Sequence, residues 1–197
     1  ATLLGKRIQE HMEEFNLDAF DIGFHGGEPL LMKPDKIQEI IDCIQGEVST
    51  KISFGLQTNG VLINDEYCEL FKKNGISISV SIDGLKESHD KNRVDHKNEA
   101  SWDKVVAGIH KLQEKCPDNF VGILAVIDID SSPIDTFDYL ASFGVDIDFL
   151  LPLQNYHDLP YWPNGDKTAY GKWYFEIYKE WINGRNSNID VRFIKNI

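Results

Sequence analysis

Residues 19–31 read AFDIGFHGGEPLL, and this stretch begins the pattern that sets the fold. Residues 19–25 form a short apolar run of the length that a buried β-strand takes, and the run leads into His25-Gly26-Gly27-Glu28-Pro29. The two glycines leave the main chain bare beside a carboxylate, so another group can approach the backbone closely. Gly-Gly before proline is also a common turn sequence, so the motif alone leaves both interpretations open.

Strand-like and helix-like segments alternate along the chain. Strands separated by helices predict right-handed βαβ units and a parallel sheet, which is either an open doubly wound sheet or a β/α barrel; periodicity does not choose between the two. The expected strands cover 19–25, 51–60, 75–84, 121–129 and 145–153, with one more short strand over 189–194. The expected helices cover 2–16, 133–143 and 166–184 and begin at Pro34, near Asn64 and near Ser101, while 86–100 is expected to be a loop.

Composition excludes several classes of protein. A chain of 197 residues suits one domain or most of a larger one. The formal charge of −12 argues against a nucleic-acid partner, which needs a basic face. No apolar run approaches the roughly 18 residues of a membrane span, and residues 1–15 have the pattern of an amphipathic helix rather than a secretory signal. These features predict a soluble cytoplasmic protein without membrane partners.

The three cysteines, Cys43, Cys68 and Cys116, are odd in number and far apart. They form neither a disulfide framework nor a metal motif, and we expect them to be small apolar residues of the core. GxGxxG, GxxxxGK and HExxH motifs are absent from the sequence. The sequence therefore predicts no metal site within this chain.

Three predicted strands end in polar residues beside a glycine. The endings are the His25–Pro29 segment, Gln57-Thr58-Asn59-Gly60 and Ser81-Ile82-Asp83-Gly84. Parallel geometry places the carboxyl ends of the strands on one rim, where α/β proteins bind their ligands. Asn-Gly and Asp-Gly are each common turn dipeptides, but three such endings in order predict a site for a small polar ligand.

The same motifs resemble those of the radical S-adenosylmethionine (radical SAM) enzymes with a SPASM-type C-terminal extension. Gly26–Pro29 is similar to the GGEP motif of that superfamily, and LQTNG (56–60) and SIDG (81–84) are similar to its next strand ends. HDKNR (89–93), followed by ASWDKVVAGI, resembles a segment of the same subgroup. The resemblance implies an α/β fold, a partial (β/α)6 TIM-like barrel of parallel strands over residues 1–184. It also implies that the first strand and a cluster-binding loop lie upstream, and that 185–197 lead to a SPASM-like region.

The resemblance assigns S-adenosylmethionine as a cofactor. Gly26, Gly27 and Glu28, with Pro29 completing the motif, would bind the amino group of its methionine part, because an ammonium group needs converging acceptors. Asn59 would lie nearby, or serve only as a turn residue.

The later motifs supply the remaining candidate residues. Ser81 would hydrogen-bond the ribose, and Asp83 would shape the turn or assist. Arg93 would pair with the carboxylate of the cofactor through its guanidinium fork. His25 is a candidate for a residue that faces the substrate, with a structural role as the alternative.

The defining cysteine motif of the superfamily, CxxxCxxC, is missing from this sequence. That motif holds a [4Fe–4S] cluster, whose electron cleaves S-adenosylmethionine to a 5′-deoxyadenosyl radical that takes a hydrogen atom from the substrate. We therefore expect a central fragment of a longer enzyme, inactive by itself. The competing hypothesis is a relative without a cluster, a non-catalytic binding module of the same fold.

Residues 149–163, FLLPLQNYHDLPYWP, resemble a subset of these enzymes that modify ribosomally made peptides. The resemblance implies a precursor peptide or protein as substrate and a reductant such as a flavodoxin or ferredoxin as partner. A side-chain cross-link is the favoured reaction. Oxidation of a sulfatase cysteine or serine to formylglycine is the alternative.

Overall fold

The structure is a computed structural model that describes residues 1–95, 97–153, 157 and 161–195. None of the helices in these ranges is both long enough and apolar enough to span a membrane. Of residues 149–163, which carry the resemblance to peptide-modifying enzymes, residues 154–156 and 158–160 lie outside the described residues.

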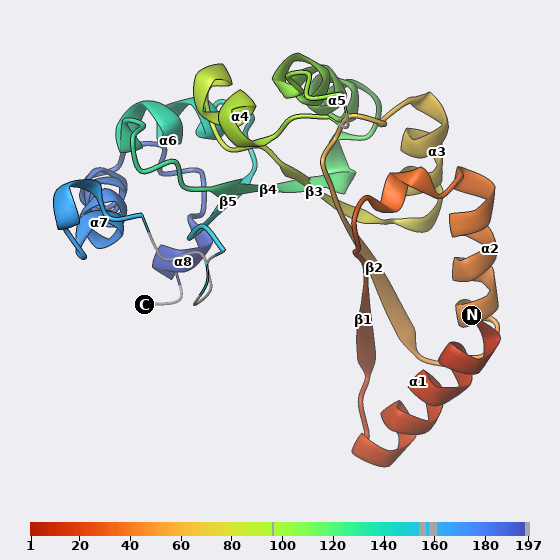
Figure 1. Ribbon diagram of the computed structural model, residues 1–197. Helices are drawn as coiled ribbons and strands as arrows, with labels where there is room; N and C mark the ends of the chain where they lie inside the picture. Colours follow the sequence, from red (N-terminus) through yellow and green to blue (C-terminus); the bar gives the residue numbers. More distant parts are fainter. Residues whose placement is uncertain (96, 154–156, 158–160, 196–197) are drawn as a thin grey trace. The chain divides into compact units, whose positions relative to one another are not determined.

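Helices and strands alternate as the sequence predicts (Figure 1). The strands are hydrogen-bonded in the order β1-β2-β3-β4-β5, so the sheet is open and does not close into a barrel within the described residues. The strands are β1 (Ala19–Phe24), β2 (Lys51–Thr58), β3 (Ser77–Ser81), β4 (Phe120–Val126) and β5 (Asp146–Leu150). The helices are α1 (Thr2–Phe15), α2 (Pro34–Gln45), α3 (Asp65–Asn74), α4 (Lys86–Asn92), α5 (Trp102–Lys115), α6 (Pro133–Ala141), α7 (Ala169–Ile182) and α8 (Arg192–Lys195). Short 3-10 turns are η1 (Pro29–Leu31), η2 (Pro117–Asn119) and η3 (Pro163–Gly165).

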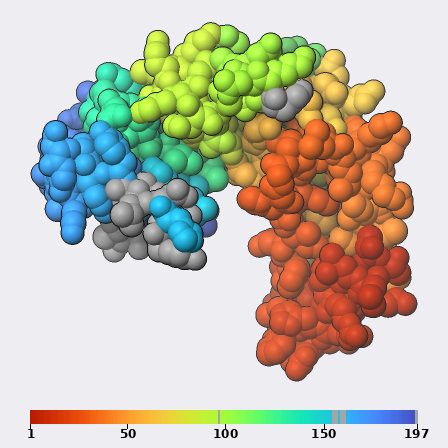
Figure 2. Space-filling model, in the orientation of Figure 1, coloured from red at the N-terminus to blue at the C-terminus, as the bar shows by residue number. Residues whose placement is uncertain are grey.

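Backbone contacts divide the chain into two compact units. Unit 1 comprises residues 1–79 and 107–121. In it, β1 and β2 pair in parallel from Ala19 opposite Lys51 to Phe24 opposite Leu56. Helices α1 and α2 lie side by side and form one continuous surface (Figures 1 and 2). Their inner faces and β2 supply a core of buried apolar side chains: Ile8, Met12, Ile37, Ile41, Ile44, Phe54 and Leu56.

Local signals in the sequence account for the helix ends of unit 1. Pro34 occupies the first turn of α2, where a missing N–H removes no hydrogen bond. Asn64 caps α3, because its side chain accepts a hydrogen bond from the Tyr67 N–H at 3.1 Å. Gly75, with φ +60°, ends α3 in the left-handed conformation that favours glycine.

A second glycine lets α5 approach the loop that follows β2. A Cβ atom at Gly108 would lie 2.2 Å from the carbonyl oxygen of Gly60, well inside any real contact distance. Only a residue without a side chain fits at this position. The helix can therefore lie directly against the main chain of the LQTNG motif.

Unit 2 comprises residues 80–106 and 122–197. Strands β4 and β5 pair in parallel from Gly122 opposite Asp146 to Val126 opposite Leu150. Helix α6 packs against both α7 and β5. The core of the unit is made of buried apolar side chains: Phe137, Leu140, Ile147, Phe149, Trp173, Ile177 and Val191.

Two sequence-based expectations are wrong. The segment 86–100 is not all loop, because residues 86–92 form α4. Its sequence has no hydrophobic period, and contacts of its polar side chains hold it in place, as described below. The segment 189–194 is not a strand: Val191 makes an isolated parallel bridge with Ile147, and the chain then turns into α8.

Candidate functional site

Glu28 joins the ends of β1 and β2 in unit 1. Its Oε1 accepts hydrogen bonds from the Leu30 N–H at 3.0 Å and from the Thr58 hydroxyl at 2.7 Å. Its Oε2 accepts the Asn59 N–H at 2.8 Å. Thr58 in turn accepts the Gly60 N–H at 3.0 Å, so the turn after β2 is linked to this carboxylate both directly at Asn59 and through Thr58.

The region before Glu28 leaves the backbone open. A Cβ atom added at Gly26 or Gly27 would meet no heavy atom within 4 Å, and Gly26 has a φ of +145° that side chains disfavour. The Gly26 N–H donates to Nδ1 of the exposed His25 at 2.9 Å. A carboxylate offers about four lone pairs, so the three donors on Glu28 leave about one acceptor position on Oε2. Bare main chain beside an incompletely used carboxylate is suited to an ammonium group.

Pro29 begins the turn η1, which the Glu28 side chain caps. The carbonyl oxygens of Leu30 and Met32 both accept from the Tyr67 hydroxyl, at 2.6 and 3.1 Å. Tyr67 thus fixes the chain that follows the GGEP motif. Burial raises the pKa of this hydroxyl, so it stays a proton donor.

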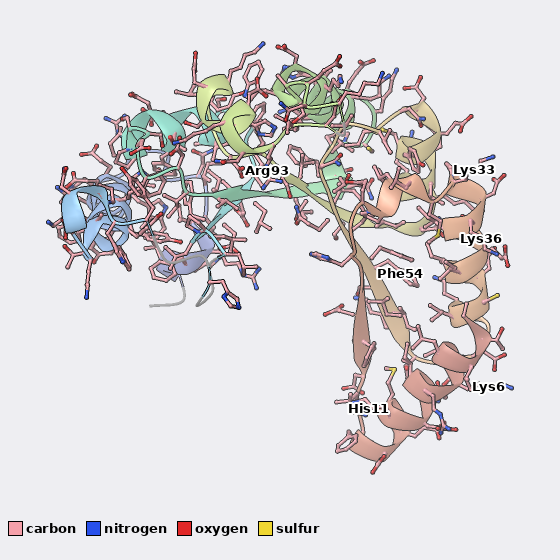
Figure 3. The ribbon with its side chains drawn as sticks, viewed as in Figure 1. Lys6, His11, Lys33, Lys36, Phe54 and Arg93 are labelled. Carbon is pink, nitrogen blue, oxygen red and sulfur yellow. The ribbon has the colours of Figure 1, made fainter. Side chains whose placement is uncertain are left out.

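In unit 2, Asp83 and Arg93 form a bidentate ion pair. Arg93 Nε donates to Asp83 Oδ2 at 2.5 Å, and Nη2 donates to Oδ1 at 2.8 Å. Asp83 Oδ1 also accepts the Val126 N–H at 2.8 Å, which ties the end of β3 to the end of β4. Asp83 is 6% exposed, so this pair is a fixed part of the unit rather than a surface contact. Arg93, labelled in Figure 3, follows the last turn of α4.

His89 lies fully buried beside that pair. Its Nδ1 accepts the Asp83 N–H at 3.2 Å, and its Nε2 lies 3.0 Å from the Ser101 hydroxyl oxygen. Burial lowers the pKa of His89, so the ring is neutral at pH 7. Ser101 also donates to the carbonyl oxygen of Arg93 at 2.6 Å.

The other charged side chains of α4 bind different partners. Asp90 Oδ1 accepts the N–H groups of Ser101 and Trp102 at 3.0 and 2.9 Å, and so caps the start of α5. Lys91 pairs with Asp128 at 3.0 Å and with Asp130 at 2.9 Å, after the end of β4. A helix without a hydrophobic face is thus held by polar contacts on several sides.

A cavity of about 360 Å³ lies against the ion pair. Its lining includes Asp83, Ser88, Asn92, Arg93 and Asp128. Ser81, the last residue of β3, is half-buried.

The structure therefore brings the predicted residues together in two groups, one in each unit. Glu28 contacts Asn59, and Asp83 contacts Arg93. The ligand contacts that the resemblance implies for these residues remain predictions. The sequence predicts no role in the site for Thr58, His89 or Ser101. All three nevertheless stand inside the motifs that carry the resemblance: Thr58 in LQTNG, His89 in HDKNR and Ser101 in ASWDKVVAGI.

The cysteines do not fit an iron–sulfur cluster. Cys43 lies on α2, Cys68 on α3, and Cys116 precedes η2. Cys68 and Cys116 are buried, and burial raises the pKa of the Cys116 thiol to about 12, which disfavours the thiolate that metals bind. No group of three or more His, Cys, Asp or Glu side chains is arranged to hold a metal ion in the described parts of the chain.

Several known proteins are similar to this chain. A cysteine-type anaerobic sulfatase-maturating enzyme of Clostridium novyi is 36% identical over 91 residues, which are 45% of this chain and 24% of that protein. A serine-type anaerobic sulfatase-maturating enzyme of Bacteroides thetaiotaomicron is 35% identical over 114 residues, 57% of this chain and 27% of that protein. The radical SAM cyclopropyl synthase TigE of Paramaledivibacter caminithermalis is 28% identical over 152 residues, 77% of this chain and 29% of that protein.

Solved structures share the fold. The chain matches anSMEcpe with bound AdoMet at a TM-score of 0.80 and 22% identity, over 96% of this chain and 54% of the other. It matches anSMEcpe with bound AdoMet and the Kp18Cys peptide at a TM-score of 0.78 and 24% identity, with the same coverage. The chain thus spans about half the length of these structures, and its matched parts are about a quarter of the curated relatives. The model of the radical SAM superfamily matches residues 6–140, more than half of the chain. The protein therefore belongs to the radical SAM superfamily.

Proposed function

We propose that this chain is the S-adenosylmethionine-binding part of an enzyme that modifies a side chain of a peptide or protein. The Glu28 group carries the proposal: one carboxylate organises two strand ends and keeps about one acceptor position beside the open backbone of Gly26 and Gly27. Membership of the radical SAM superfamily supports the choice of ligand.

The proposal assigns one role to each predicted residue. Glu28 and the main chain of Gly26 and Gly27 take the ammonium group, with Pro29 and Asn59 holding the two turns. Arg93 takes the carboxylate, Ser81 the ribose, and Asp83 holds the arginine. His25, exposed at the end of β1, is a candidate for substrate contact.

Bound S-adenosylmethionine, with an electron from a reduced [4Fe–4S] cluster, supplies a radical that removes a hydrogen atom from the substrate. Cys43, Cys68 and Cys116 do not form a site for that cluster, so other residues must hold it. A flavodoxin or ferredoxin would deliver the electron. Without cluster ligands, the 197-residue chain is expected to bind the cofactor without turning over.

Two reactions have specific support. Formylglycine formation is favoured by the sulfatase-maturating relatives, which are 36% and 35% identical to this chain. A bond-forming reaction, of which the side-chain cross-link is one kind, is supported by the cyclopropyl synthase, whose name describes ring formation and whose similarity covers 77% of this chain. A polypeptide substrate is supported by anSMEcpe, which has been solved with a bound peptide.

Cofactor binding is tested by titrating S-adenosylmethionine into the chain in a calorimeter. We expect saturable binding that Glu28→Gln weakens, because the substitution removes the negative charge that faces the ammonium group. Glu39→Gln is the matched control, since Glu39 is exposed on α2 and pairs only with Lys36 among the described residues. Figure 3 labels Lys36 on this helix. Equal affinities of the two variants would contradict the role given to Glu28.

The two reactions are separated by the product. A reading frame that contains this chain and a cluster site would be incubated with sulfatase-derived peptides and with candidate precursor peptides. A product aldehyde that reacts with a hydrazide probe supports formylglycine. A product that has lost two hydrogens, does not react with the probe, and gives linked fragments in tandem mass spectrometry supports a cross-link. S-adenosylmethionine cleavage with neither product would contradict both.

A further inference from the structure

Arg93 is held from two directions at once. Its guanidinium is bound by the Asp83 carboxylate through Nε and Nη2. Its carbonyl oxygen accepts the Ser101 hydroxyl at 2.6 Å. His89 joins the two residues that hold Arg93: its Nε2 bonds to the Ser101 hydroxyl, and its Nδ1 accepts the Asp83 N–H. Asp83, Arg93, Ser101 and His89 therefore form a closed ring of hydrogen bonds, called the Arg93 ring below.

The direction of each hydrogen bond in the Arg93 ring is determined. A carbonyl oxygen only accepts, so the Ser101 proton goes to Arg93. The Ser101 oxygen must then accept from His89 Nε2, which carries the ring proton. Nδ1 has no proton and accepts the Asp83 N–H. Only one neutral tautomer of His89 satisfies all of these partners.

The Arg93 ring leaves part of the guanidinium available. Arginine has five N–H donors, and Asp83 takes two of them, so three have no partner within the described residues. The side chain of Arg93 is 29% exposed and lines the cavity of about 360 Å³. Because Asp83 already balances the charge, attraction by charge alone is weak here. The contacts of the Arg93 ring instead fix the orientation of the three free N–H donors.

We propose that His89 and Ser101 are positioning residues for Arg93: His89 acts through the main chain of Asp83 and through Ser101, and Ser101 acts on the main-chain carbonyl of Arg93. Together they aim the free N–H groups of Arg93 at the carboxylate of the cofactor. The inference rests on the proposed function, since it takes S-adenosylmethionine as the ligand. It adds a role for His89 and Ser101, which are not among the residues that line the cavity.

Two substitutions at His89 each remove one of its two hydrogen bonds in the Arg93 ring and leave the net charge unchanged. His89→Gln keeps a donor near Nε2 for Ser101 and lacks an acceptor at Nδ1. His89→Asn keeps an acceptor near Nδ1 for the Asp83 N–H and lacks the donor to Ser101. Ile177→Val is the control for a general loss of stability, because Ile177 is fully buried in the same unit and lies outside the ring.

The measurement is the dissociation constant of each variant for S-adenosylmethionine and for decarboxylated S-adenosylmethionine, which lacks only the carboxylate. We expect each His89 variant to bind S-adenosylmethionine about five- to tenfold more weakly, the equivalent of about one hydrogen bond. Affinity for the decarboxylated ligand should stay unchanged. A ¹⁵N spectrum should also show the Arg93 Nε–H signal shifted in both His89 variants and unmoved in Ile177→Val.

Each other outcome has a distinct meaning. Equal weakening for both ligands would overturn the inference, because the effect would then be structural. Unchanged affinity for both ligands in both His89 variants would also overturn it and leave the proposed function intact. If the unsubstituted chain binds neither ligand, the proposed function fails and the inference fails with it.

Discussion

Glu28→Gln should destabilise unit 1 by a predictable amount. The glutamine amide has one oxygen where the carboxylate has two, and the donors lie on both: Leu30 N–H and Thr58 hydroxyl on Oε1, Asn59 N–H on Oε2. In the better orientation the amide oxygen keeps the first two donors and its NH₂ group faces the Asn59 N–H. One charge-assisted bond is lost and two others become neutral. For a half-buried group this amounts to about 2 kcal/mol.

Urea unfolding followed by circular dichroism measures the change. With an m-value of about 2 kcal/mol/M, the midpoint should fall by about 1 M. The Asn59 amide should exchange with deuterium about 30-fold faster, since 1.4 kcal/mol is a factor of ten. Glu39→Gln should leave the midpoint almost unchanged, because its pair with Lys36 is exposed. An unchanged midpoint with unchanged Asn59 exchange would refute the account of Glu28 as the link between the strand ends.

Three further substitutions or conditions test other features. Gly108→Ala should destabilise the chain by about 1–3 kcal/mol, because its Cβ would meet the Gly60 carbonyl oxygen. Gly171→Ala should instead stabilise α7 by up to about 1 kcal/mol, because no heavy atom lies near the added Cβ. Thermal melts of the two variants measure both effects. Tyr139→Phe should raise the melting temperature, since the buried hydroxyl has no hydrogen-bond partner within the described residues; a lower melting temperature would mean that the hydroxyl is satisfied. Burial lowers the pKa of His89 below 6.5, so as the pH falls the unfolded chain takes up a proton before the folded chain does. The free energy of unfolding should therefore fall as the pH drops below about 6.5. Urea midpoints from pH 8 to 5 should show this fall, and the fall should be smaller in His89→Gln.

Much of the fold was predictable because its signals are local. Pro34 and Asn64 mark the starts of α2 and α3, and the structure uses them as a first-turn proline and an N-cap. The apolar run over 19–25 became β1, which ends at Phe24 immediately before the GGEP motif. Alternating strands and helices were enough to predict parallel pairing, which the registers of β1 with β2 and β4 with β5 confirm.

What escaped prediction depends on contacts between distant residues. Helix α4 has no hydrophobic face to reveal it, and its partners lie elsewhere in the chain, such as Asp128 for Lys91. Thr58 acts through Glu28, 30 positions away. The sequence suggested Arg93 as a ligand for a carboxylate, but only the structure shows that Asp83 takes two of its donors. A motif indicates which residues matter, but it does not show how many hydrogen-bond partners each residue has in the folded chain.

The segment between Arg93 and Ser101 has a consequence for tolerance to insertions. Surface loops usually accept added residues, because nothing depends on their length. Here the bridge between Val94 and Ala100 fixes how the chain returns, so that the next residue, Ser101, reaches the Arg93 carbonyl oxygen. One added residue would move Ser101 out of register, and with it the Asp90 cap of α5. In a library of single-residue insertions along this chain, insertions between Val94 and Ala100 should therefore be as harmful to function as insertions in a buried strand.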